Sequence, residues 1–172
     1  SELAISELDA KYGKVCHRLA NNILGSTQDA EECVNDAYLG TWNAIPPQRP
    51  APLLSFVCVL VRRYSIMRYR ANTAMKRNSS YDACMEEIEN CIAAPGRVED
   101  HYEAKVLART IERFLDTLNR ENRVIFMRRY WYSDSYAAIA ALTGLTEKNV
   151  SVRLARVRKQ LRDYLMKQGV LT

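Results

Sequence analysis

Basic side chains gather in two stretches of the chain, at spacings that suit contact with a polyanion. The first stretch runs from Arg62 to Arg77 and contains six basic residues with no acidic residue between them. The second lies near the C-terminus, where Lys148, Arg156 and Lys159 recur at helical spacing. Because a solvated helix face normally mixes both signs of charge, unmixed cations favour contact with nucleic-acid phosphates.

Charge is segregated along the 172 residues, although the net charge is only +5. Residues 1–78 carry 10 basic and 7 acidic side chains, residues 79–104 carry 1 and 7, and residues 105–172 carry 14 and 6. Two basic blocks joined by an acidic connector predict two modules that face a polyanion, with a different segment between them. The alternative is that the basic helix faces are merely solvated.

Residues 135–165 have the pattern of a helix-turn-helix. Gly144 supplies a turn residue that accepts a positive φ, and Thr146 is placed to cap the second helix. The apolar stripe of that second helix is Val150, Leu154, Val157, Leu161 and Leu165. The alternative is an ordinary helical hairpin with a basic exterior.

The face opposite that stripe has side chains suited to reading bases in the major groove. Arginine and lysine bind guanine there, and asparagine binds adenine. The candidate residues on and beside this face are Lys148, Asn149, Ser151, Val152, Ala155, Arg156 and Lys159. Arg153, Arg158 and Arg162 lie nearer the sides of the helix, where we expect contact with phosphate.

Helical spacing predicts three helices in the first block. The first carries apolar residues from Ile5 to Ile23 and ends at Gly25, and Ser26 caps a second helix that runs to about Trp42. The expected buried face of the second helix is Ala30, Cys33, Val34, Ala37, Tyr38 and Thr41. Its expected outer face is Glu31, Glu32, Asn35, Asp36 and Leu39.

Four of the five prolines fall in a stiff loop from Asn43 to Pro52, and a long helix is expected from Leu53 to Asn72. The expected inner face of this third helix is Val57, Leu60, Val61, Tyr64, Met67 and Ala71. Its other face combines basic, aromatic and apolar groups, namely Ser55, Val59, Arg62, Ile66, Tyr69 and Arg70. Such a mixture is unusual for a solvated face.

Residues 79–97 are acidic, show no sustained helical period and contain Pro95-Gly96. We expect a linker here, with one helical turn around Met85. Helical spacing resumes at Val98, and Ser133 is expected to begin the first helix of the helix-turn-helix. With only 6 glycines and 5 prolines in the chain, we expect an all-α fold of two small helical domains joined by this linker.

Metal binding and enzymatic chemistry have little support. The five cysteines include no C-x-x-C pair, and Cys84, Cys91 and His101 lack the paired spacing of a zinc site. His17 and His101 are isolated, and no carboxylate cluster resembles a metal site. We therefore expect no cofactor, no metal and no catalytic residue.

Membrane insertion is not expected either. The longest apolar run, from Leu53 to Val61, is far shorter than the ~20 residues that a membrane span needs. No charged-then-apolar signal segment opens the chain. These features predict a cytoplasmic protein.

Taken in order, the two halves resemble a bacterial RNA polymerase sigma factor of the sigma-70 family, in its short extracytoplasmic-function (ECF) group. The first half resembles the family in DAEECVNDAYLGTWNAIPPQRPAPLLSFVCVLVRRYSIMRYRANTAMKR, from Asp29 to Arg77. The second resembles it in RVIFMRRYWYSDSYAAIAALTGLTEKNVSVRLARVRKQL, from Arg123 to Leu161. With the flanking helices, the likeness covers nearly the whole chain apart from residues 79–97.

The resemblance implies a subunit without catalytic activity that binds core RNA polymerase and directs initiation at particular promoters. Residues 1–78 would form sigma region 2, residues 79–97 a linker that the family threads through polymerase, and residues 98–172 sigma region 4. Region 2 would bind the β′ coiled coil of polymerase through Glu31, Glu32, Asn35, Asp36 and Leu39. Region 4 would contact the β flap and would bind the minus-thirty-five element through its second helix, Arg153 included.

The resemblance also implies that region 2 opens and binds the minus-ten element. Strand opening needs cations for the backbone and planar groups on which unstacked bases can rest. The implied residues are Arg62, Arg63, Ile66, Tyr69, Arg70, Lys76 and Arg77. Tyr69 is the candidate planar group, whereas Tyr64 is expected to pack inward. An anti-sigma factor is a further partner implied by the likeness alone.

Several positions depart from the family pattern. Arg63 and Met67 stand where asparagine, and then aspartate or asparagine, are common, and Phe56 stands where tryptophan is usual. Ala138 replaces a frequent glutamate, and Ser151 replaces a frequent basic residue. These differences do not affect the expected fold, but they prevent a base-by-base prediction of the promoter.

The alternative function is a stand-alone helix-turn-helix regulator that binds duplex DNA as a dimer. The first half of the chain weighs against it, because its loop and basic-aromatic helix have no role in duplex binding. A nucleic-acid-processing enzyme is a third class, which the isolated histidines and scattered carboxylates do not support.

Overall fold

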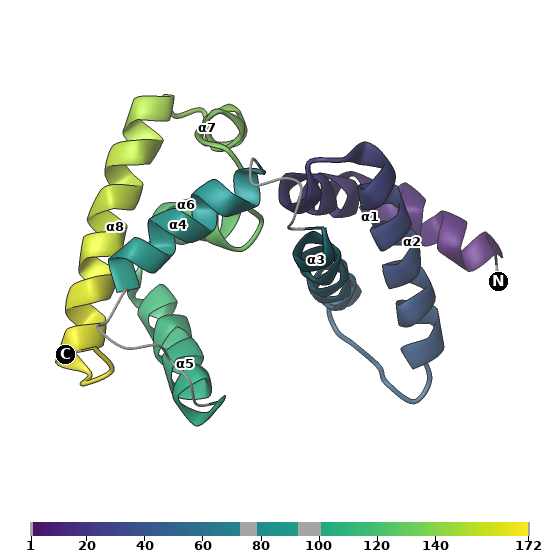
Figure 1. The fold of residues 1–172 in the computed structure, drawn as a ribbon, viewed down its shortest axis with the longest axis horizontal. Coiled ribbons are helices and arrows are strands. Elements are labelled where there is room, and N and C mark those ends of the chain that lie inside the picture. The colour runs from purple at the N-terminus through teal and green to yellow at the C-terminus, as the bar shows by residue number, and fades with distance from the viewer. Residues whose placement is uncertain (1, 73–78, 93–100, 172) are drawn as a thin grey trace. The chain divides into compact units, whose positions relative to one another are not determined.

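The computed structural model describes residues 2–72, 79–92 and 101–171. Those residues form eight helices and no strand, which confirms the all-α prediction (Figure 1). The helices are α1 (Glu2–Leu24), α2 (Thr27–Ala44), α3 (Leu53–Ala71), α4 (Ser80–Ile92), α5 (His101–Thr117), α6 (Arg120–Tyr130), α7 (Tyr136–Thr143) and α8 (Glu147–Lys167). The chain divides into two compact units, unit 1 (Ser1–Ala83) and unit 2 (Cys84–Thr172). Within the described ranges, no helix is long and apolar enough to cross a membrane.

In unit 1, α1, α2 and α3 pack against one another as a three-helix bundle (Figure 1). All three helices contribute fully buried side chains, among them Leu19, Ile23, Val34, Tyr38, Val57 and Val61. Each such apolar side chain stabilises the fold by about 1.5–3 kcal/mol relative to its exposed state. The buried Tyr38 hydroxyl donates to Asp9 Oδ1 at 2.9 Å, so its polar group has a partner.

The second helix begins and faces inward as the sequence predicts. Ser26 Oγ accepts a hydrogen bond from the backbone N–H of Asp29 at 3.3 Å, and Gly25 before it has a φ of +65°. The buried residues of α2 are the predicted set, Ala30, Cys33, Val34, Ala37, Tyr38 and Thr41. The predicted outer residues Glu31, Glu32, Asn35, Asp36 and Leu39 are all exposed.

The inner face of α3 differs from the prediction in its C-terminal half. Met67, expected inside, is 60% exposed, and Ala71 is exposed as well. Ser65 is instead fully buried and continues the buried stripe that contains Val61. Helical periodicity carries that stripe on to Arg68, which is ion-paired to α2, so that Met67 points outward.

In unit 2, α8 contacts α5, α6 and α7 (Figure 1). Its buried residues are the predicted stripe, Val150, Leu154, Val157, Leu161 and Leu165. The core is completed by side chains from the other helices, including Phe114, Ile125, Phe126 and Ile139. The long apolar face of α8 is therefore the surface on which unit 2 assembles.

The first helix of the helix-turn-helix begins later than predicted. Ser135 caps α7 and accepts a hydrogen bond from the backbone N–H of Ala138 at 3.1 Å. Ser133, predicted to begin the helix, is buried and has a φ of +59°. A residue with left-handed backbone does not begin a right-handed helix, so the prediction of Ser133 was wrong.

The acidic segment contains a 13-residue helix, α4, where a linker with one helical turn was expected. That expectation was wrong because Cys84, Ile88 and Ile92 recur every four positions. Cys84 is fully buried, and both isoleucines pack against the core of unit 2. The glutamates between these residues dominate the composition of the segment. The helical repeat of these three positions was therefore overlooked in the sequence. The division between the two units, after Ala83, falls inside the segment expected to be a linker.

Candidate nucleic-acid interface

The helix-turn-helix consists of α7, a short turn and α8. Gly144 ends α7 with a φ of +75°, and its backbone N–H donates to the Ala140 carbonyl at 2.9 Å. Thr146 Oγ1 accepts a hydrogen bond from the backbone N–H of Asn149 at 3.1 Å and so caps α8. Both predicted signals are confirmed, and together they fix the direction in which α8 starts.

Most of the predicted base-reading residues lie exposed on α8, namely Lys148, Asn149, Val152, Ala155, Arg156 and Lys159. Ser151 and Arg153 are half-buried. Val152 is 40% exposed, and a small apolar side chain of this kind suits contact with a thymine methyl group. The helix thus presents cations, an amide and small apolar groups on neighbouring turns.

Arg153, predicted as a phosphate contact, has two side-chain partners within unit 2. Its Nε donates to Asn149 Oδ1 at 3.0 Å, and its Nη1 lies 2.7 Å from Glu121 Oε2. Two of its donor groups are therefore already engaged by side chains of unit 2.

Arg158 and Arg162, also predicted to contact phosphate, both contact α4. Arg158 Nη1 donates to Glu87 Oε1 at 2.6 Å and to the Tyr130 hydroxyl oxygen at 2.7 Å. Arg162 Nη1 donates to the Cys91 carbonyl oxygen at 2.9 Å. These two arginines therefore connect α4 to α8.

Glu87 is the centre of a polar cluster that joins α4 to α6, α7 and α8. Besides Arg158, its oxygens accept hydrogen bonds from Arg129 at 3.0 Å, Tyr130 at 2.5 Å and Tyr136 at 2.6 Å. Arg129 is 5% exposed, and its guanidinium lies 4.0 Å from the centre of the Tyr136 ring.

Burial alone would raise the pKa of Glu87. The hydrogen bonds from Arg129, Tyr130 and Tyr136 outweigh burial, so the pKa of this carboxyl is lowered. Sequence reasoning missed the cluster because the partners of Glu87 are 42 to 71 positions away along the chain.

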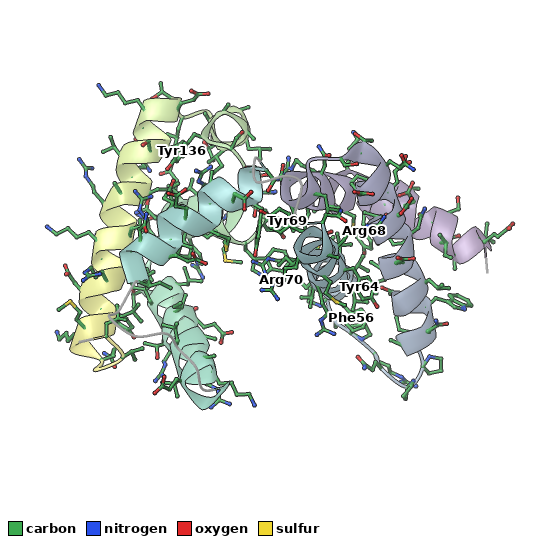
Figure 2. The ribbon with its side chains drawn as sticks, viewed as in Figure 1. Phe56, Tyr64, Arg68, Tyr69, Arg70 and Tyr136 are labelled. Atoms are coloured by element: carbon green, nitrogen blue, oxygen red, sulfur yellow. The ribbon has the colours of Figure 1, made fainter. Side chains whose placement is uncertain are left out.

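The predicted minus-ten residues on α3 are partly accessible. Arg63 and Arg70 are exposed, whereas Arg62, Ile66 and Tyr69 are half-buried. Figure 2 shows Tyr69 and Arg70 on this helix. The two remaining predicted residues, Lys76 and Arg77, lie outside the described residues. The structure therefore brings five of the seven predicted positions onto one helix.

Tyr69 contacts the start of α4 within unit 1. Its hydroxyl donates to Asp82 Oδ1, and its ring meets that of Tyr81 edge-on, with 5.2 Å between ring centroids. Burial and the hydrogen bond to Asp82 raise the pKa of Tyr69 to about 12. The phenol is therefore neutral at physiological pH.

Arg68 is paired with α2 rather than added to the cationic face of α3 (Figure 2). Its Nη2 lies 3.1 Å from Asp29 Oδ1 and 2.8 Å from Glu32 Oε2. Glu32, one of the five predicted polymerase-binding residues, thus has a cationic partner within the protein. The tyrosine predicted to pack inward, Tyr64, is half-buried.

No three histidine, cysteine or acidic side chains in the described part of the chain are placed to hold a metal ion. The five cysteines are free thiols. Two of those considered for zinc donate instead to backbone carbonyls, Cys84 to Asp134 at 3.8 Å and Cys91 to Arg158 at 3.0 Å. His17 lies 3.1 Å from Asp9 Oδ1. The third zinc candidate, His101, has a side chain outside the described part.

Comparisons with known proteins identify both halves of the chain. The family model for Sigma-70 region 2 matches residues 8–75, and the model for Sigma-70, region 4 matches residues 108–161. The ECF RNA polymerase sigma factor SigE of Mycolicibacterium smegmatis (strain ATCC 700084 / mc(2)155) is 24% identical over 163 residues, which is 95% of this chain. The chain spans 62% of the length of that relative. The two models together match more than half of the chain, and region 2 as a helical bundle, followed by region 4 as a helix-turn-helix, shows that the chain belongs to the sigma-70 family.

Proposed function

We propose that this protein binds core RNA polymerase and directs transcription initiation at one class of promoters, as a subunit without catalytic activity of its own. The observation that carries the proposal is the exposed face of α8, with its cations and amide, in a chain that also contains region 2. The protein would act in the cytoplasm, where bacterial DNA and polymerase are found.

Unit 2 would bind the minus-thirty-five element as a duplex. Lys148, Asn149 and Arg156 lie in the first three turns of α8, the part of a recognition helix that enters the major groove. Lysine and arginine donors match the acceptors of guanine, and an amide matches adenine. Ser151, Val152, Ala155 and Lys159 border these residues on α8 and would contact the neighbouring bases and backbone.

Unit 1 would open the promoter at the minus-ten element. Arg63 and Arg70 supply exposed cations for the backbone, and Tyr69 supplies a ring on which an unstacked base can rest. Arg62 and Ile66 lie about two turns and one turn before Tyr69 on α3. Lys76 and Arg77 would add positive charge further along the chain.

The outer face of α2 would bind the β′ coiled coil of polymerase. Leu39 is 51% exposed there, and Glu31, Asn35 and Asp36 surround it with polar groups. Glu32 would contribute through a carboxylate shared with Arg68. Contacts of unit 2 with the β flap, and control by an anti-sigma factor, are proposed from the family likeness.

Reconstitution with core polymerase tests the proposal. The purified chain is expected to form a one-to-one complex with core enzyme and to support run-off transcription from a subset of a promoter library. Core enzyme alone is the control. A chain that neither bound core enzyme nor supported initiation would contradict the proposal. Tight dimers on palindromic duplexes without polymerase, seen by sedimentation, would favour the stand-alone regulator instead.

A matched pair of substitutions tests the role of α8. Arg156→Ala should cost about 1–3 kcal/mol of upstream recognition, because a base-reading arginine contributes that much to discrimination. Lys167 lies exposed in the last turn of the same helix, so Lys167→Ala serves as the control. Promoter selection by the two holoenzymes is the measurement. An unchanged sequence preference in the Arg156 variant would remove that residue from the interface.

A further inference from the structure

Arg153 links a base-reading position on α8 to a carboxylate on another helix. Asn149 lies one turn before it on α8, and Glu121 lies in the first turn of α6. We propose that Glu121 and Arg153 orient the side-chain amide of Asn149 toward the DNA, which makes Arg153 a positioning residue rather than a phosphate contact. This inference rests on the proposed function of α8 and adds a determinant of its base preference.

The geometry of a guanidinium group makes such a role possible. The group is planar, and its N–H donors point in fixed directions. Glu121 Oε2 lies 2.7 Å from Nη1 of Arg153, and Asn149 Oδ1 accepts from Nε at 3.0 Å. Two acceptors on different helices therefore fix the plane of the guanidinium. Nε is bonded to Asn149 on α8, and Nη1 is held by Glu121 on α6.

Asn149 is held through both its backbone and its side chain. Its backbone N–H donates to Thr146 Oγ1 at 3.1 Å, and its Oδ1 accepts from Arg153. A flipped amide would turn the NH2 group toward the guanidinium and place donors against donors. The amide is therefore kept with its oxygen at Arg153 and its NH2 group directed elsewhere, available to an acceptor on a base edge.

This orientation predicts the kind of base that Asn149 selects. Purine N7, guanine O6 and thymine O4 are acceptors in the major groove, whereas cytosine N4 is a donor. An amide that offers its NH2 group favours the acceptors and disfavours cytosine at that position. Without Arg153 the amide can present either its oxygen or its NH2 group to the base, so the discrimination against cytosine weakens.

The contacts among Glu121, Arg153 and Asn149 lie at the surface of the protein. A role in base preference can therefore be distinguished from a role in stability. The side chain of Arg153 is 30% exposed and that of Glu121 is 48% exposed. Ion pairs in such positions contribute little to the free energy of unfolding. We therefore expect substitutions at Arg153 and Glu121 to change base preference while the thermal midpoint of the protein stays the same.

Selection from a library of promoters with randomised upstream DNA tests the inference, with holoenzyme reconstituted from the full chain. The variant N149A identifies the base position that Asn149 reads. Both R153A and E121A should reduce the preference at that same position by at least about threefold and leave the other positions unchanged. The matched control is R156A, which should act at a different position.

Conservative variants separate orientation from charge. The variant E121Q retains an oxygen that accepts from Arg153, so the preference should be kept. The variant R153K retains the charge but cannot hold both acceptors in one plane, so the preference should not be restored.

A phosphate contact at Arg153 predicts the opposite results. In that case R153A would weaken binding to all sequences alike and reduce the salt slope of log K by about 0.9, and R153K would restore both. That outcome, or a lowered thermal midpoint with changes at every position, would overturn the inference. Failure of the proposed function looks different, because wild-type holoenzyme would then select no upstream sequence at all.

Discussion

At the scale of single residues, Tyr69 carries two separable groups. Its hydroxyl is bonded to Asp82, and its ring lies edge-on to Tyr81. With a pKa raised to about 12, the hydroxyl remains a neutral donor across the physiological range. Base stacking needs the ring and not the hydroxyl, so substitution can test one without the other.

Replacing Tyr69 by alanine should impair promoter opening, and replacing it by phenylalanine should not. Stacking of a base on an aromatic ring contributes about 1–3 kcal/mol, which the alanine variant loses. Adding Arg62→Ala should deepen the defect in opening more than the defect in closed-complex binding. Permanganate reactivity of unpaired thymines reports opening, and filter binding reports the closed complex. Equal reactivity of the alanine variant and the wild type would exclude Tyr69 as a stacking platform.

At the scale of helices, Glu87 connects α4 to the other helices of unit 2. Glu87→Ala leaves Arg129, which is 5% exposed, without its carboxylate partner. Loss of one member of a buried ion pair costs about 3–5 kcal/mol, so unit 2 should lose stability by that order. Glu89 is exposed on the same helix, and Glu89→Ala is the matched control. Urea unfolding with hydrogen exchange in α6 and α8 measures both, and equal stability of the two variants would count against this role.

The same carboxylate makes the stability of unit 2 depend on pH in the acid range. The pKa of Glu87 is lowered from an ordinary value of 4.5, so its contribution to stability is complete above about pH 4.5. That contribution is lost as the pH falls through the lower folded-state pKa, where the carboxylate takes up a proton. Glu87→Gln cannot ionise and should show a shallower loss of stability below pH 4.5. Thermal midpoints across this acid range provide the comparison, and parallel curves for the two proteins would disprove the assignment.

Helix faces and caps could be predicted from the sequence because their causes are local. The buried stripe of α8 repeats within one helix, and the caps Ser26 and Thr146 act on residues three positions away. The partners of Arg158 could not be predicted, since Glu87 is 71 positions distant and belongs to a segment that composition marks as a solvated linker. Most side chains predicted for the DNA-facing side of α8 are exposed, although Ser151 and Arg153 are half-buried. The partners of Arg153 emerged only from the fold.

At the scale of the whole molecule, two units that both bind promoter DNA, as proposed, need not bind independently. Once one unit is bound, the other searches at a high effective concentration, and the combined affinity can exceed either one by about 10²–10⁴. Under this proposal, two interfaces of moderate affinity would together give an affinity for the promoter that neither unit reaches alone. This advantage requires that each unit remain folded, so the position of the boundary between them matters.

The boundary can be tested with two fragments. Residues 79–172 retain α4 and Glu87, whereas residues 98–172, the extent of region 4 predicted from the sequence, leave Arg129 and Arg158 without that carboxylate. The shorter fragment also lacks Ile88 and Ile92, which pack against the core of unit 2. A loss of about 3–5 kcal/mol shifts the thermal midpoint of a domain this size by more than ~10 °C. The longer fragment should therefore unfold cooperatively at the higher temperature, as measured by circular dichroism, and matching midpoints for the two fragments would place the boundary after α4 instead.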